Sequence, residues 1–233
     1  MATMTSRSRL ALLALLCCCG LALAQKKEPV LLQADKGRFS LLLEGKSIGH
    51  EEFEIAPSGA GWTARGTTSL KTEKGADTRV TGTLTLAADG SPLAYDWTSQ
   101  AEKSSGAHVL FSNGIAKITL EMQGARPFEQ DLSFGEQRIA VLDNNLYHQY
   151  AVLARLYDWS KGGSQQLPVL IPQELTPGTL TLESAGSRTV DDKPYEGLRV
   201  STSDLEILLL LDSRHKLMRI EVPSAKVSVV REP

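Results

Sequence analysis

The chain has 233 residues, 42% of them hydrophobic, and a formal net charge of -2 at pH 7. A slightly acidic chain lacks the basic face that nucleic-acid binding requires, so we expect no nucleic-acid partner. The length is sufficient for a sizeable core and allows either one large β domain or two smaller ones.

Residues 1–24 have the three parts of a secretory signal peptide. Arg7 and Arg9 precede an apolar run, residues 10–19, which is followed by the small-residue cleavage sequence Ala22-Leu-Ala24. The apolar run is too short to span a membrane, and no later stretch approaches the roughly 20 apolar residues that a spanning helix needs. We therefore predict cleavage after Ala24, a periplasmic or secreted location, and no transmembrane segment in the mature chain.

All three cysteines, Cys17, Cys18 and Cys19, fall inside the predicted signal peptide. A mature chain without cysteine forms no disulfide, which is more typical of a bacterial periplasmic protein than of a small eukaryotic secreted one. Lipidation is the less favoured alternative, because the residue before a lipidated cysteine is normally small, whereas Leu16 or another cysteine stands there.

Most of the mature chain has the alternation that is typical of β-strands. Residues 25–36 are predicted to be an N-terminal arm or a first edge strand, and residues 37–233 a single β-rich domain. The clearest alternation runs from Val80 to Leu86, where apolar residues and glycine alternate with threonine. Short glycine-containing turns such as Ser112-Asn-Gly114 predict hairpins. The continuous apolar run 208–211 predicts a strand that is covered on both faces.

The segment 144–159 is the one stretch with the pattern of a helix of useful length. Asp143 and Asn144 are favourable N-cap residues, and Gly162-Gly163 provides a stop. The apolar side chains fall at helical spacing and form a broad face: Leu146, Tyr147, Tyr150, Ala151, Leu153, Ala154 and Tyr157. Roughly ten strands against one helix predict a mainly β fold, a single curved antiparallel sheet or unclosed β-barrel that wraps one central α-helix.

The sequence contains no recognisable catalytic or metal-binding motif. The four histidines, His50, His108, His148 and His215, do not lie at metal-ligand spacing from one another, so we predict neither a metal nor another cofactor. No serine lies in a nucleophile-elbow motif. The weak enzymatic alternative is a hydrolase that uses His148 with Asp143 or Asp158.

The helix and the sheet around it form the candidate ligand site. Aromatic and polar side chains on one short segment can line a pocket and orient the polar end of a ligand. The predicted ligand-binding residues are Leu146, Tyr147, His148, Tyr150, Leu153, Tyr157 and Trp97. The alternative is that the same side chains fill a solid core.

Two segments also resemble a known group of proteins. The central sequence DNNLYHQYAVLARLYDWSKGGSQQLPVLIPQ and the ending LDSRHKLMRIEVPSAKVSVVRE, together with the strand pattern, are similar to those of uncharacterised periplasmic β domains of bacteria. These domains are similar in architecture to the LolA/LolB-like half-barrel carriers of lipoproteins. The resemblance implies an unclosed barrel with an apolar concave face covered by helix, which in some members binds acyl chains.

These observations lead to two main hypotheses for function. The first is an exported, non-catalytic binding or carrier module that holds a hydrophobic, lipid-like ligand in a groove between the curved sheet and the helix. The second is a structural or interaction protein of the cell envelope with a filled core, which binds a partner protein through a sheet edge or the N-terminal arm.

Overall fold

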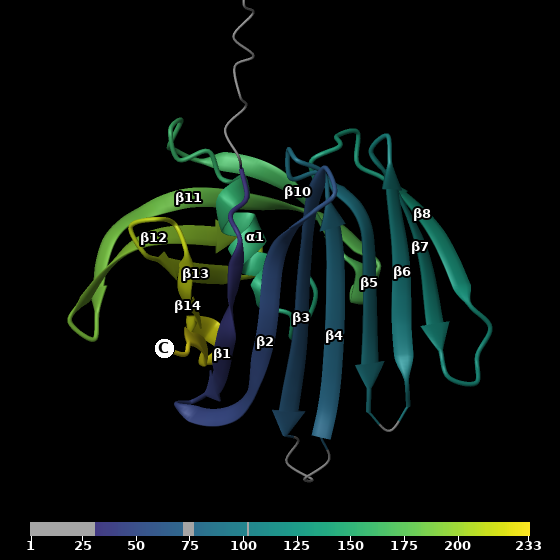
Figure 1. The fold of residues 1–233 in the computed structure, drawn as a ribbon, viewed down its shortest axis with the longest axis horizontal. Coiled ribbons are helices and arrows are strands. Elements are labelled where there is room, and N and C mark those ends of the chain that lie inside the picture. The colour runs from purple at the N-terminus through teal and green to yellow at the C-terminus, as the bar shows by residue number, and fades with distance from the viewer. Residues whose placement is uncertain (1–30, 72–76, 102) are drawn as a thin grey trace, which may run out of the picture.

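The computed structural model describes residues 31–71, 77–101 and 103–233. The predicted signal peptide and the first part of the predicted arm lie outside these residues. The described part contains fifteen strands, one α-helix and two 3-10 turns (Figure 1). The elements are β1 (Asp35–Leu43), β2 (Lys46–Ser58), β3 (Gly61–Lys71), β4 (Asp77–Leu86), β5 (Pro92–Gln100), β6 (Ser105–Ser112), β7 (Ile115–Met122), β8 (Phe128–Ser133), β9 (Ala140–Val141), α1 (His148–Leu156), β10 (Gln165–Ile171), η1 (Pro172–Glu174), β11 (Thr176–Val190), β12 (Lys193–Ser201), β13 (Glu206–Leu211), β14 (Leu217–Val222), η2 (Pro223–Ala225) and β15 (Val227–Arg231).

All strands of the described ranges belong to one sheet, in the order β8-β7-β6-β5-β4-β3-β2-β1-β15-β14-β13-β12-β11-β10-β9. Neighbours are antiparallel except β9 and β10, which are parallel. β1 lies in the middle because it pairs with both β2 and β15. The two halves of the sheet curve around α1, and β8 and β9, consecutive in sequence, remain its unpaired ends (Figure 1). This arrangement confirms the predicted curved, unclosed sheet, with more strands than the ten expected.

Alternation along the strands places one face of the sheet in the core. In β3, Trp62, Ala64 and Thr68 are buried, whereas the intervening Arg65 is exposed. In β13, Leu209, Leu210 and Leu211 are all at most 1% exposed, so both faces of this strand are covered there, as the continuous apolar run predicts. Leu32 is also buried in the core, so the predicted arm 25–36 ends as part of the packed domain.

The helix is shorter than the predicted 144–159, and its start has a different cause. Asn145 has a left-handed backbone (φ 65°), which interrupts any helix that begins before it. The N-cap is Tyr147, which makes no capping side-chain hydrogen bond. Tyr157, with ψ 127°, ends the helix before the glycine pair is reached. The helix packs against β2, β3 and β14 on the concave face.

No helix of the described ranges has the combination of length and apolar character that crossing a membrane requires.

Candidate functional site

Two glycines on neighbouring strands create a depression beneath the start of the helix. Gly66 of β3 pairs with Gly82 of β4, which in turn pairs with Trp97 of β5. A Cβ atom at Gly66 would lie 2.2 Å from His148 Nδ1, and one at Gly82 would lie 2.6 Å from Leu146 Cδ1. The segment that leads into α1 therefore lies directly on the sheet because these two positions carry no side chain.

Glu51 of β2 is the buried partner of His148. The ring lies with Nδ1 2.6 Å from Glu51 Oε1, and the backbone N–H of His148 donates to Glu51 Oε2 over 2.9 Å. Both side chains are 0% exposed. A carboxylate only accepts hydrogen bonds, so the ring donates from Nδ1. The other ring nitrogen, Nε2, is buried without a hydrogen-bond partner among the described residues.

A second buried carboxylate, Asp143, joins three elements. Tyr95 of β5 donates its hydroxyl to Asp143 Oδ2 over 2.7 Å, and the backbone N–H of Gln173 in η1 donates to Oδ1 over 2.9 Å. The backbone N–H of Asp143 itself donates to Gln149 Oε1 of α1 over 2.6 Å. Asp143 was predicted to cap the helix, but its carboxylate instead ties the loop before α1 to β5 and η1.

Burial raises the pKa of Asp143 from its ordinary value of 3.8 to about 7, although the hydrogen bonds from Gln173 and Tyr95 act in the opposite direction. Between these two values the folded state binds more protons than the unfolded state. The contribution of this group to stability is therefore largest below about pH 4 and is lost as the pH rises to about 7.

We expect the Asp143→Asn variant to lose this part of the pH dependence, because an amide does not titrate. Urea denaturation at pH 5 and pH 8 measures the effect as the change in unfolding free energy between the two conditions. The unfolding free energy should fall between pH 5 and pH 8 in the native protein. The fall should be smaller in the variant. Equal pH dependence in the two proteins would contradict the assignment of this titration to Asp143.

The structure places the predicted ligand-binding residues mostly in solid packing. Leu146, His148, Leu153, Tyr157 and Trp97 are each at most 7% exposed, and Tyr147 and Tyr150 are half-buried. Leu146, His148 and Trp97 meet around the two glycines, whereas the Tyr157 hydroxyl lies beyond the helix end and donates to Gly163 O over 2.8 Å. Their role as ligand contacts remains a prediction.

The predicted acidic partners of His148 are also placed elsewhere. Asp143 binds Tyr95 and Gln173, and Asp158 is exposed and accepts hydrogen bonds from Ser160. The partner of His148 is Glu51, which lies 97 positions away in the sequence. No local spacing around His148 indicates this pairing.

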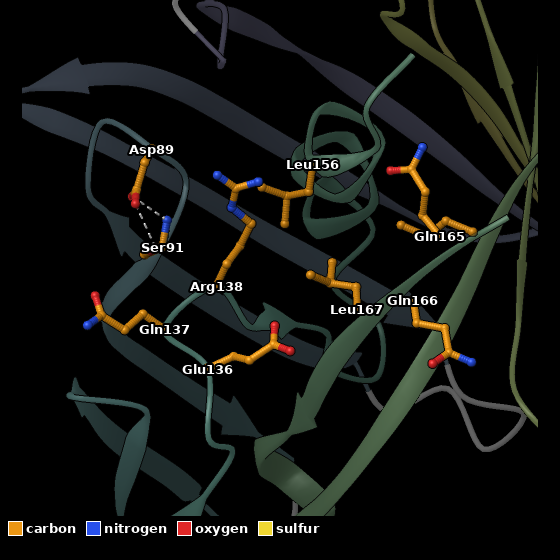
Figure 2. A pocket seen from close by; sticks show the side chains of 10 residues that line it. Asp89, Ser91, Glu136, Gln137, Arg138, Leu156, Gln165, Gln166 and Leu167 are labelled. Carbon is orange, nitrogen blue, oxygen red and sulfur yellow. Dashed lines mark hydrogen bonds between the residues drawn. The ribbon is translucent and has the colours of Figure 1, made fainter. Parts of the chain in front are cut away.

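A cavity of about 480 Å³ lies between the end of the helix and the curved sheet (Figure 2). Its walls come from five segments: the turn between β4 and β5, the connection between β8 and β9, the last residue of α1, strand β10 and strand β11. The connection between β8 and β9 joins the two unpaired ends of the sheet, so the cavity lies where the barrel does not close. The lining residues are Asp89, Ser91, Glu136, Gln137, Arg138, Leu156, Gln165, Gln166, Leu167 and Leu182.

Arg138 is the cationic group of this cavity. Its side chain extends beside Leu156 (Figure 2), and it is exposed. Among the ion pairs and side-chain hydrogen bonds of the described residues, none includes Arg138. Asp89 is differently engaged, since its two carboxylate oxygens accept from the N–H and the hydroxyl of Ser91. The guanidinium is therefore available to a bound anion.

The sequence prediction did not include this cavity. The lining combines residues up to 93 positions apart, from Asp89 to Leu182, which no local pattern brings together. The sequence places polar residues at 136–138 and two glutamines at 165 and 166, but nothing in it indicates that these segments meet.

The sequence matches no protein-family model and no curated protein. Among solved structures, the chain is similar to a β-barrel-like protein of the domain of unknown function DUF1849 from Brucella abortus. That match has a TM-score of 0.57 and 13% identity, and covers 88% of this chain and 97% of the other. A DUF1089 family protein from Pseudomonas aeruginosa matches with a TM-score of 0.49 and 11% identity, over 75% of this chain and 90% of the other. The first likeness supports a β-barrel-like fold; similarity to the LolA/LolB-like carriers remains a prediction.

Proposed function

We propose that this protein is an exported, non-catalytic binding module that holds a small ligand in the cavity between α1 and strands β10 and β11. One observation carries the proposal: Arg138, which has no ion-pair partner in the described chain, lies beside Leu156 in a cavity of about 480 Å³. This volume falls within the roughly 300–1,000 Å³ that is typical of small-molecule sites. A barrel-like domain is compatible with such a role.

The chemistry of the lining defines the ligand class. Seven of the ten lining residues have polar side chains. The three leucines, Leu156, Leu167 and Leu182, are each at most 7% exposed, so they offer only a small apolar surface. The proposed ligand therefore has an anionic group for Arg138 and a short apolar part. This is more polar than the lipid-like ligand predicted from the sequence, which would require a long apolar channel.

Replacing Arg138 with alanine is expected to weaken binding of a small branched carboxylate, 4-methylpentanoate, by about 10- to 100-fold. The reason is that a hydrogen bond to a charged group contributes about 1.5–3 kcal/mol. Isothermal titration calorimetry measures the affinity. Arg188→Ala is the matched control, because Arg188 is an exposed arginine of β11 outside the cavity.

The same titrations test the ligand class. Palmitate and octanoate extend the panel toward the lipid-like ligand. Binding of palmitate that is insensitive to Arg138→Ala would favour the lipid carrier over the proposed site. Failure of every carboxylate in the panel, and of the dipeptide leucyl-leucine, to bind would refute the proposed function.

A filled core favours the second candidate, an envelope interaction protein. The segment at the start of the helix packs directly on the sheet, without a gap. Strand β8 is an end strand of the described sheet. An end strand can accept an extended partner segment through its backbone groups. Gln130→Pro on β8 removes a backbone donor from this strand. Loss of a co-purified envelope protein in this variant would support the candidate, and unchanged recovery would count against β8 as the contact.

A further inference from the structure

We infer that the ligand of this cavity is a zwitterion, an amino acid derivative or short peptide, whose carboxylate binds Arg138 and whose ammonium group binds Glu136. This inference rests on the proposed function and adds the second charged contact. Glu136 and Arg138 both line the cavity, both are exposed, and both come from the connection between β8 and β9.

The two opposite charges are separate. Glu136 and Arg138 do not form an ion pair with each other, and no ion pair of the described ranges includes Glu136. In Figure 2 the Arg138 side chain extends toward Leu156, whereas the Glu136 carboxylate lies toward Leu167. The cavity therefore presents a cation and an anion at different points of one wall. Such a wall matches a ligand with two charged ends.

The third charged group of the lining, Asp89, adds a second negative charge to the cavity. Both oxygens of Asp89 are engaged by Ser91, at 2.9 Å from its N–H and 3.1 Å from its hydroxyl. These hydrogen bonds leave the negative charge of Asp89 in place, so the lining carries one positive and two negative charges. A simple anion on Arg138 would be repelled by these two carboxylates, whereas an ammonium group on the ligand is attracted to Glu136.

The uncharged lining matches the middle of a peptide. Gln165 is already bound to the backbone, since its amide group contacts Asp158 and Gly162 over 2.8–3.2 Å. Gln137 and Gln166 make no side-chain hydrogen bond with a described residue, and their side chains extend away from Leu156 and Leu167 (Figure 2), so their amides can contact a ligand only at the edge of the cavity. The small exposed surface of the three leucines contacts part of an apolar side chain.

Three dipeptide probes separate the two ends of the ligand. Leucyl-leucine carries both charges, N-acetyl-leucyl-leucine only the carboxylate, and leucyl-leucinamide only the ammonium group. Calorimetric titration of the native protein should show leucyl-leucine binding at least 10-fold more tightly than either blocked probe. In Glu136→Gln the advantage over the acetylated probe should disappear, and in Arg138→Gln the advantage over the amide probe should disappear.

Two exposed residues outside the cavity give matched controls. Glu129→Gln on β8 and Arg188→Gln on β11 should leave all three affinities unchanged. If the acetylated probe binds as tightly as leucyl-leucine and still depends on Arg138, the zwitterion is wrong while the proposed function stands. If none of the three probes binds but 4-methylpentanoate does, the zwitterion is again wrong. If neither these probes nor 4-methylpentanoate bind, both proposals fail.

Discussion

Glu51→Leu should destabilise the folded protein by about 3–5 kcal/mol, the largest loss that we expect from a change in the buried polar cluster. The substitution removes the acceptor of two hydrogen bonds, one from the His148 backbone N–H and one from its ring. Both donors are fully buried, so no water replaces the lost carboxylate. Urea denaturation gives the unfolding free energy. Glu51→Gln should lose less, because the amide oxygen still accepts from the backbone N–H.

An exposed pair of the same kind provides the control. Asp96 and His108 contact each other across β5 and β6, with side chains 59% and 50% exposed. Asp96→Asn should change stability by less than about 1 kcal/mol, because exposed pairs contribute little. A small effect of Glu51→Leu, similar to that of Asp96→Asn, would show that the buried contact does not hold the helix start to the sheet.

The fold was predictable because its signal is local. Strand alternation such as that from Val80 to Leu86 reports which side chains face the core, and a long series of such strands with one helix leaves few alternatives to a curved sheet. The helix boundaries were less predictable. Asp143 has the residue type of a cap, but Tyr95 and Gln173, which are distant in sequence, bind its carboxylate instead. The left-handed backbone at Asn145 then delays the helix start.

The site was less predictable because its contacts are long-range. The pairing of His148 with Glu51 depends on the curvature that places β2 beneath the helix start, and the sequence around His148 does not contain that information. The predicted ligand-binding residues are mostly buried between the helix and the sheet. Because an apolar side chain that fills a core is of the same type as one that lines a groove, their role as ligand contacts stays a prediction. The cavity lies beside the polar connection between β8 and β9, next to the end of α1.

Gly66→Ala should destabilise the fold by about 3 kcal/mol or more, since overpacking and loss of buried hydrogen bonds combine at this position. The new Cβ would lie 2.2 Å from His148 Nδ1 and 2.4 Å from Glu51 Oε1. These two atoms form the buried contact between the helix start and β2, so neither can move away without weakening it. The helix start would have to leave the sheet. Urea denaturation measures the loss, and near-ultraviolet circular dichroism of the aromatic side chains, Trp97 and Tyr95 among them, reports the change in packing.

Gly178→Ala in β11 is the matched control, because the nearest atom to its new Cβ would be Val169 Cγ1 at 3.4 Å, an ordinary contact. This variant should be neutral or more stable by up to about 1 kcal/mol, since alanine restricts the unfolded chain more than glycine does. Gly82→Ala, with a Cβ 2.6 Å from Leu146 Cδ1, should fall between the two because a leucine methyl group can rotate away. The loss of stability should decrease in the order Gly66, Gly82, Gly178. This order is expected because the segment before the helix packs directly on the sheet at the first two positions and not at the third. A Gly66→Ala variant as stable as the native protein would mean that the helix start is not held there.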